Sequence, residues 1–269
     1  MRNVRIKPTF ADRRYRRRTF TVKCHDRVIL TTVTSTPAVV RSWLHRVISS
    51  FIHHFRARRL VVGLGVQWRE DCSQAATLQL CVGRFCLIFQ LLYARNVPRS
   101  LRRFLSNPNI TFVGVGNSRD RGMLSRSRHE IDVDQLVDAR YVAAERRNIS
   151  VRVSMERLAE MILGMSGLDK PEEIGRSNWN VSLLSHKQVV YACVDAFVSF
   201  CLGRDLDAWD WNRNINEVAF AGHSICLIET AAPAQLDPIP EYSSDDEIAA
   251  VEYEDDQYHY DEDCGSYFI

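Results

Sequence analysis

The stretch from Val61 to Trp68 constrains the fold most strongly. It reads Val-Val-Gly-Leu-Gly-Val-Gln-Trp, so its apolar residues lie next to one another instead of at every second position. A strand with one solvated face alternates apolar and polar side chains, whereas a strand covered on both faces is apolar almost throughout. We therefore expect residues 60–66 to form an inner strand of a sheet that carries helices on both faces.

Further strands are expected before and after this one. Two form a hairpin at 19–24 and 28–34, two more form a hairpin at 76–82 and 85–90 around the tight turn Gly83–Arg84, and one lies at 110–115. Pro37 opens a helix whose apolar residues keep helical spacing, and Ser185 with Gln188 matches a capping box. Helices are also expected at 98–106, from about 117, at 138–147, at 154–163 and from 185 to about 202. Together the elements predict an α/β fold with a mixed central sheet flanked by helices.

Length and composition narrow the class of protein. A chain of 269 residues with 46% hydrophobic residues suits one large domain with tails. The sequence has no run of eighteen apolar residues and no apolar signal-peptide core, so we expect neither a membrane span nor secretion. The eight cysteines include no Cys-x-x-Cys pair, which argues against a zinc site. Several lie in apolar runs typical of buried thiols, and a reducing compartment, the nucleus or the cytoplasm, fits them.

The net charge of +2 conceals an asymmetry. Residues 1–20 contain eight Lys or Arg and one acidic residue, whereas residues 236–269 contain twelve acidic residues and no Lys or Arg. We therefore divide the chain into a basic N-terminal extension (1–18), a folded domain (19–208), a C-terminal extension (209–235) and an acidic tail (236–269) that we expect to be disordered.

Each tail has functional interpretations and a plain solvated one. The basic cluster at 13–18 is either a nuclear address or phosphate-binding arm, or a solvated extension. The acidic tail either competes with nucleic acid for basic surface or binds a protein partner, or it is simply solvated.

An ordered series of motifs carries a family resemblance. The motifs are Gly65-Val66-Gln67-Trp68, Ala76-Thr77-Leu78-Gln79-Leu80-Cys81, Leu87-Ile88-Phe89-Gln90, Phe112-Val113-Gly114-Val115-Gly116 followed by Asp120, Asn178-Trp179, and Tyr191-Ala192-Cys193-Val194-Asp195. From about residue 18 to about residue 206, the chain resembles the DEDD-type 3′-5′ exonucleases with a tyrosine in the last motif. Among these it is similar to the Werner syndrome exonuclease-like plant proteins. The resemblance implies a ribonuclease H-like exonuclease fold.

The resemblance also implies a chemistry and a set of residues. The family uses two Mg or Mn ions held by carboxylates, of which one activates the attacking water and the other stabilises the leaving oxygen. Asp120, Tyr191 and Asp195 match the family's catalytic positions, and Asp120 and Asp195 match its metal ligands. The first motif differs, because Gly65 and Gln67 replace the family's Asp and Glu.

The altered first motif leaves the activity open. Glu70 and Asp71 lie nearby in sequence, but they follow Trp68, where the strand is expected to end. The first hypothesis is an exonuclease-like protein that binds nucleic acid and has lost or greatly reduced nuclease activity. The second is an active metal-dependent 3′-5′ exonuclease that releases nucleotides from DNA or RNA. The third is a protein-interaction domain with no nucleic-acid role.

Nucleic acid, with single-stranded 3′ ends foremost, is the partner expected under the first two hypotheses. Four arginines surround the Asp120 segment and are candidates for phosphate contacts: Arg119, Arg121, Arg126 and Arg128. The alternative is that they form an ordinary solvated basic surface. No membrane partner is expected.

Overall fold

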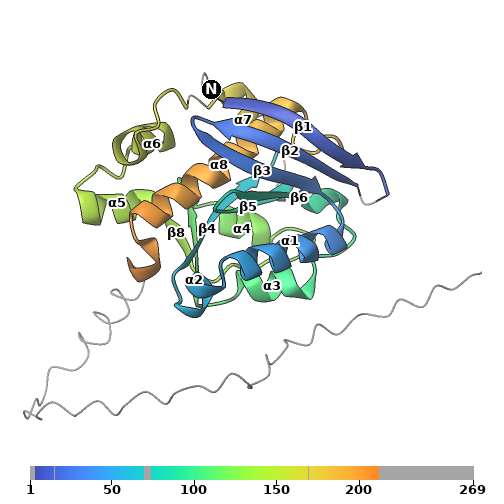
Figure 1. Cartoon of the computed structure of the whole chain (residues 1–269), viewed down its shortest axis with the longest axis horizontal. Helices are drawn as coiled ribbons and strands as arrows, with labels where there is room; N and C mark the ends of the chain where they lie inside the picture. Colours follow the sequence, from blue (N-terminus) through green and yellow to red (C-terminus); the bar gives the residue numbers. More distant parts are fainter. Residues whose placement is uncertain (1–3, 15, 70–73, 169, 212–269) are drawn as a thin grey trace, which may run out of the picture. The chain divides into compact units, whose positions relative to one another are not determined.

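The strand expected at the centre of the fold is β4 (Leu60–Gln67), and every residue in it is buried. The computed structural model describes residues 4–14, 16–69, 74–168 and 170–211 (Figure 1). Within it, β4 pairs antiparallel with β5 (Thr77–Val82) and parallel with β7 (Ile110–Gly114). The uninterrupted apolar run of β4 is explained by this position, because helices cover both faces of the sheet there (Figure 1).

The sheet has eight strands in the order β1-β2-β3-β6-β5-β4-β7-β8. The remaining strands are β1 (Val4–Asp12), β2 (Arg17–Cys24), β3 (Arg27–Thr34), β6 (Phe85–Gln90) and β8 (Leu136–Asp138). From β6 to β8 only β5 runs opposite to the others, which is the strand order of the ribonuclease H-like fold. The expected α/β fold class is therefore confirmed.

The helices follow the strands in the order that the sequence predicts. They are α1 (Pro37–Ser50), α2 (Ile52–Arg56), α3 (Arg99–Leu105), α4 (Asp120–Ser125), α5 (Ala139–Arg147), α6 (Met155–Leu163), α7 (Glu172–Gly175) and α8 (His186–Asp205), with a 3₁₀ turn at Leu91–Tyr93. The capping box of Ser185 and Gln188 forms and starts α8. Gly164 ends α6 in a left-handed conformation with a φ of 66°.

Helix α8 lies directly against β4, and a glycine makes this possible. A β-carbon at Gly63 would lie 1.9 Å from the carbonyl oxygen of Ala196 and 2.5 Å from the amide nitrogen of Phe200. Only a residue without a side chain leaves room for the helix backbone at this point. The close approach fixes α8 over the strand and brings Asp195, on the preceding turn, above Gly65.

The structure differs from the sequence expectation at the N-terminus. The segment expected as a basic extension (1–18) contains β1, which pairs antiparallel with β2 as an edge strand. Its sequence gives little sign of this, because only Val4 and Ile6 pack against the core and the register shifts between Pro8 and Phe10. The expected strands and helices otherwise form, with ends shifted by a few residues, and α2, α7 and β8 are additional.

The C-terminal boundary can be compared only up to residue 211. Trp209 and Trp211 pack against the core, and the Trp211 ring nitrogen donates a hydrogen bond to Glu145. The rest of the extension (212–235) and the acidic tail (236–269) lie outside the described residues. Among the residues that are described, no helix is long and apolar enough to cross a membrane.

Candidate active site

The carboxyl end of β4 faces the first half of α8, and the side chains of Gln67 and Asp195 meet there. Tyr191 and Asp195 lie one turn apart on α8 and share a face. The side-chain amide of Gln67, at the end of β4, donates a hydrogen bond to Oδ2 of Asp195 at 3.2 Å. A glutamate at this position could not donate such a bond, so the glutamine turns a neighbouring carboxylate into a hydrogen-bond partner.

A lysine completes the surroundings of Asp195. Nζ of Lys170 lies 2.7 Å from Oδ1 of Asp195, and the two side chains are only 15% and 13% exposed. The same ammonium group lies over the Tyr191 ring, 4.6 Å from its centre. Burial lowers the pKa of Lys170, but the negative charge of Asp195 and the neighbouring Tyr191 outweigh it and raise the pKa above its usual value. The lysine is therefore a permanent internal cation at neutral pH.

The position of the missing first-strand carboxylate is filled from β5. Gly65 pairs with Gln79 across the strands, and a β-carbon on Gly65 would lie 2.8 Å from Oε1 of Gln79 and 3.2 Å from Oδ2 of Asp195. Gln79 is fully buried, and its amide donates to the hydroxyl of Thr77 at 2.5 Å. Any side chain at position 65 would have to displace this glutamine.

Asp120 lies in the first turn of α4 and is 8% exposed. Burial and the charge of Asp195 raise its pKa to about 8, against the opposing charge of Lys170. Its carboxyl group therefore favours the protonated form at neutral pH, and a metal ion that bound there would have to displace this proton.

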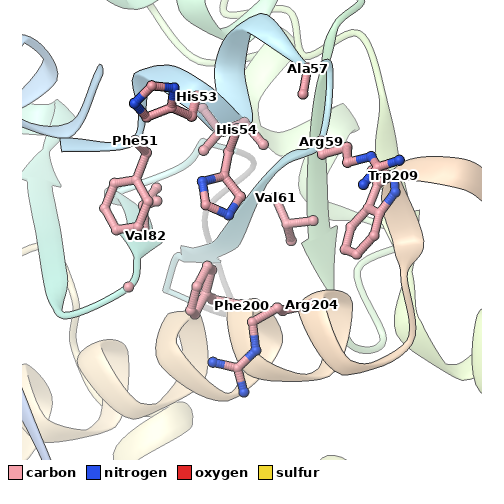
Figure 2. A pocket seen from close by; sticks show the side chains of 12 residues that line it. Phe51, His53, His54, Ala57, Arg59, Val61, Val82, Phe200, Arg204 and Trp209 are labelled. Carbon is pink, nitrogen blue, oxygen red and sulfur yellow. The ribbon is translucent and has the colours of Figure 1, made fainter. Parts of the chain in front are cut away.

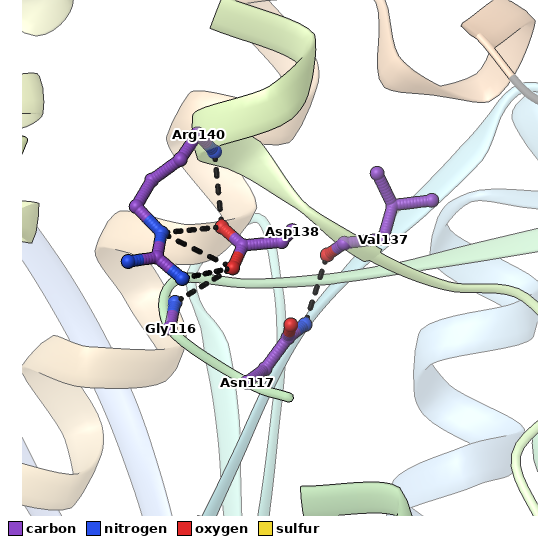
Figure 3. Close-up of polar contacts among 5 residues, drawn as sticks. All are labelled: Gly116, Asn117, Val137, Asp138 and Arg140. Atoms are coloured by element: carbon purple, nitrogen blue, oxygen red, sulfur yellow. Dashed lines mark hydrogen bonds and ion pairs between the residues drawn. The ribbon is translucent and has the colours of Figure 1, made fainter. Parts of the chain in front are cut away.

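The loop that leads from β7 to Asp120 is held in place by β8 (Figure 3). Asp138 caps α5 by accepting from the backbone N–H of Arg140, forms an ion pair with the Arg140 guanidinium at 2.6 Å, and accepts from the N–H of Gly116 at 3.1 Å. The Asn117 side chain donates to the Val137 carbonyl at 3.0 Å. The carboxylate of Asp138 is thus committed to positioning the backbone.

Residues 66–207 match the family model described as 3′-5′ exonuclease. The chain belongs to the 3′-5′ exonuclease family. Among curated proteins, it is similar to the 3′-5′ exonucleases of Drosophila persimilis and Drosophila willistoni, at 29% and 30% identity over 153 residues. These matches cover 55% of this chain and 43% of each relative, so the chain spans less than half the length of these relatives.

Solved structures are also similar to this chain. One is the EXD2 exonuclease domain soaked in Mn and GMP, which is 25% identical, with 74% of this chain and 99% of that chain covered and a TM-score of 0.39. Another is Brucella melitensis NrnC, which is 16% identical, with 60% and 79% covered and a TM-score of 0.49.

The side chains at this family member's site do not fit a pair of divalent metal ions. Two of the four expected acidic positions hold Gly65 and Gln67, and a third, Asp120, is protonated at neutral pH. The fourth, Asp195, is already paired with Lys170. Among the described residues no three His, Cys, Asp or Glu side chains are grouped so that they could hold a metal ion. Glu70 and Asp71, the nearby acidic pair, lie outside the described residues.

The three residues matched to the family's catalytic positions are nevertheless brought together. Asp195 influences the pKa of both Asp120 and Tyr191, and Lys170 lies between Asp195 and Tyr191. Burial raises the pKa of the Tyr191 hydroxyl, which therefore remains protonated at neutral pH. Lys170 contacts both Asp195 and Tyr191, whereas Asp120 is linked to Asp195 and Lys170 through their charges.

The four candidate arginines around Asp120 are all exposed, but three of them contact the protein itself. Arg121 donates to the carbonyl of Asp134 at 2.7 Å, Arg126 contacts the sulfur of Met123 at 3.7 Å, and Arg128 donates to the carbonyl of Ala94. Arg119 is the N-cap residue of α4. A guanidinium has five N–H donors, so these contacts leave donors for a phosphate while restricting how the side chains move.

Two residues of the site were missed by the sequence analysis. Gln79 gave a weak signal, since it is a polar residue inside a strand of buried apolar ones and pairs with Gly65. Lys170 gave none, because it lies in an irregular connection and meets Asp195, 25 residues further along the chain, only through the fold.

A pocket lies at the opposite end of β4 (Figure 2). This pocket of about 460 Å³ is lined by Leu60 and Val61 at the start of the strand, by Phe200 near the end of α8, and by His53 and His54 of α2. It is separate from Asp195, which lies in the first half of α8 beside the carboxyl end of β4.

Proposed function

We propose that this member of the 3′-5′ exonuclease family binds nucleic acid without degrading it. One observation carries the proposal: Asp195, which the family uses to hold metal, is occupied by the Lys170 ammonium and the Gln67 amide. We call Gln67, Asp120, Lys170, Tyr191 and Asp195 together the Asp195 site. In it, a side-chain cation takes over the electrostatic role that metal ions have in the family.

Electrostatics supports the loss of catalysis. Two divalent cations in one site require several negative charges around them. At neutral pH the Asp195 site offers one carboxylate, and the positive charge of Lys170 balances it. A metal ion would have to displace the ammonium and deprotonate Asp120, and each change opposes binding.

The direct test is digestion of a 3′-labelled single-stranded oligonucleotide in Mg²⁺ and in Mn²⁺. We expect the full chain to shorten neither DNA nor RNA above the level of an Asp195→Asn control. Binding of the same oligonucleotide, measured by fluorescence anisotropy, should be retained in both proteins. Metal-dependent shortening that the Asp195→Asn substitution abolishes would overturn the proposal.

The second candidate function is an active metal-dependent exonuclease, which the family positions of Asp120, Tyr191 and Asp195 favour. It would use Mg²⁺ or Mn²⁺ and would need ligands beyond the described carboxylates. Glu70→Gln and Asp71→Asn variants separate the two functions, because they would abolish any shortening that depends on those side chains. If neither shortening nor oligonucleotide binding is found, the remaining function is protein interaction. The acidic tail would then be the candidate binding segment.

Within the family, we place the chain with the Werner syndrome exonuclease-like plant proteins on the motifs around Gly114, Trp179 and Tyr191. We further propose that it acts in the nucleus or the cytoplasm. Five of its cysteines are free and buried among the described residues, namely Cys24, Cys81, Cys86, Cys193 and Cys201, which suits a reducing compartment.

A further inference from the structure

The strands β1, β2 and β3 form an antiparallel extension of the sheet whose two faces differ sharply. Because strand side chains alternate, residues of equal parity share a face. Phe20, Val22 and Cys24 of β2 are buried beneath α8, where the Phe20 ring meets the His186 ring edge-on at 5.6 Å. On β3, the Thr31 hydroxyl contacts the thiol of Cys193 of α8 at 3.0 Å. This face is part of the core.

The other face of the extension is basic. Its residues on β1 and β2 are Arg5, Lys7, Phe10, Asp12, Arg17, Thr19, Thr21 and Lys23, which we call the open face. Arg5, Lys7 and Lys23 are exposed, and Arg17, Thr19 and Thr21 are half-buried. Helix α1 packs on this side of the sheet against β6 and α3, and β1 and β2 extend beyond it (Figure 1).

Among the cations of the open face, only Arg17 lies opposite an acid, Asp12. Residues 1–34 contain ten Lys or Arg and only two acidic residues, Asp12 and Asp26. Among the described residues, no carboxylate forms an ion pair with Arg5, Lys7 or Lys23. Arg5 and Lys23 lie directly opposite each other across the strands, a like-charge pair that destabilises the hairpin by itself.

Protection of a sheet edge does not explain these charges. Lysine and arginine on an edge strand prevent unwanted pairing with other chains, and β1 is the edge strand of this sheet. Lys23, however, belongs to β2, which is paired on both sides. An external polyanion, in contrast, would relieve the repulsion of both strands at once.

Aromatic and guanidinium groups give the same surface flat platforms. Phe10 is 50% exposed, and the Arg17 guanidinium lies over its ring at 4.9 Å. In the neighbouring part of the sheet, Phe85 lies beside Leu30 and has the guanidinium groups of Arg84 and Arg46 at 5.4 Å and 6.0 Å from its ring centre. Exposed rings and guanidinium planes stack on unpaired bases, which a duplex keeps inside its helix.

We propose that the open face binds single-stranded nucleic acid, with Arg5, Lys7 and Lys23 contacting phosphates and Phe10 stacking on a base. The inference rests on the nucleic-acid binding of the proposed function, but it assigns that binding to a surface away from the Asp195 site. The open face and α8, which carries Asp195, lie on opposite faces of the sheet. A strand bound there is held without being presented to the family's catalytic position.

The test is fluorescence anisotropy of the full chain with a labelled oligo(dT) of about 20 nucleotides, over roughly 50 to 200 mM salt. An Arg5→Gln/Lys7→Gln/Lys23→Gln variant should lose about tenfold or more in affinity at the lowest salt. Each lost phosphate contact lowers the slope of log K against log salt by about 0.7, so the slope should fall by about 2. The matched control is Arg103→Gln/Arg147→Gln/Arg152→Gln, which removes the same charge from exposed positions elsewhere and should bind like wild type.

A Phe10→Ala variant tests the stacking separately. It should weaken oligo(dT) binding by about fivefold while leaving the salt slope unchanged, since stacking is worth about 1 kcal/mol or more per base. The two types of variant should thus change different quantities. Circular dichroism should show that every variant keeps the wild-type fold, because the replaced side chains are exposed.

The outcomes distinguish the two proposals. If wild type binds oligo(dT) and both open-face variants bind it equally well, the inference is wrong, but the proposed function stands. If wild type binds no oligonucleotide, both are wrong. Binding of a blunt duplex or of polyglutamate as tight as that of oligo(dT) would overturn the assignment to single strands and would favour a duplex or an acidic protein as the partner.

Discussion

The Asp195 site and the open face deal with charge in opposite ways. In the Asp195 site, the buried ionised groups are matched inside the protein, with Lys170 on Asp195 and a proton on Asp120. On the open face, Arg5 and Lys23 face each other across two strands, and no described carboxylate pairs with either. The first arrangement is complete without a ligand, and the second is not.

This contrast indicates where a ligand of this protein should be sought. A family's catalytic position attracts attention first, but internal pairing removes the electrostatic reason for a metal ion or a phosphate to bind there. Unpaired like charges store an unfavourable energy that only an external anion releases. In this chain the better candidate for binding is therefore the face that the family resemblance did not indicate.

The strongest way to break the first half of the comparison is to remove the internal cation. Replacing Lys170 by methionine leaves the Asp195 carboxylate buried without its partner, and we expect a loss of about 3 kcal/mol in the free energy of unfolding. Urea denaturation measures it. Lys187→Met, an exposed lysine at the start of the same helix, is the control and should change stability by less than about 0.5 kcal/mol.

A double-mutant cycle then tests the pairing itself. Lys170→Met combined with Asp195→Asn should lose clearly less than the sum of the two single substitutions, because the charge left unpaired by one is removed by the other. Strict additivity would mean that the two groups do not stabilise each other. Asp195 would then have to be regarded as available to a ligand.

The second prediction concerns the proton on Asp120. Its pKa in the folded protein is raised to about 8. The unfolded value is about 4, so between about pH 4 and pH 8 the folded state holds one more proton than the unfolded state. The stability from this proton is complete below about pH 4 and is lost as the pH rises towards 8, at up to about 1.4 kcal/mol per pH unit. Between pH 5 and 7 the free energy of unfolding of wild type should fall by about 2 to 3 kcal/mol, and that of an Asp120→Asn variant should not show this fall.

Thermal unfolding of the two proteins across this pH range measures the difference. The variant should be the more stable protein at pH 8 and similar to wild type near pH 4. Asp132→Asn, which removes an exposed carboxylate, should follow the wild-type profile. If wild type and Asp120→Asn have parallel profiles, Asp120 is ionised in the folded protein, and the Asp195 site keeps a second carboxylate for metal binding.

Much of this architecture could be predicted from the sequence because it depends on local patterns. The apolar run of β4 requires cover on both faces wherever it lies, and Ser185 and Gln188 cap α8 through groups only three residues apart. β1 was missed because Val4 and Ile6 are its only side chains against the core and its register shifts between Pro8 and Phe10. As an edge strand it depends on its pairing with β2, and pairing leaves little trace in the sequence of one strand.

The candidate site was predictable only in part, for a related reason. Asp120, Tyr191 and Asp195 were found because each lies at a fixed point of a recognisable strand or helix. Whether those groups are charged depends on Lys170, Gln79 and the depth of burial, which follow from the fold as a whole. The sequence thus indicated these three residues but could not give their protonation or the internal ion pair.

The third prediction asks whether the lost carboxylate can be restored. Gly65→Asp places a side chain against Gln79 and a second carboxylate beside Asp195. We therefore expect the free energy of unfolding to fall by about 2 kcal/mol and the Tm by about 5 °C. Gly65→Asn has the same shape without the charge, so it isolates the steric part and should lose less. In the Gly65→Asp/Gln67→Glu protein, Mg²⁺ should recover part of the loss, whereas wild type should not respond. A restored protein that is more stable than wild type in chelator would contradict the idea of a site closed by its own side chains.

The smallest expected effect sharpens the other half of the comparison. Arg5→Gln/Lys23→Gln removes the like-charge pair of the open face, so the variant should be more stable than wild type by about 0.5 kcal/mol at low salt. The gain should vanish at about 1 M salt, where screening shortens the reach of exposed charges to about 3 Å.

Added oligo(dT) should make wild type the more stable of the two proteins. A ligand that binds only the folded state raises the Tm, and wild type should bind this ligand more tightly. Scanning calorimetry with and without oligo(dT) measures both effects. A variant that is no more stable alone, and that oligo(dT) stabilises as much as wild type, would show that the two cations neither repel each other nor contact the ligand.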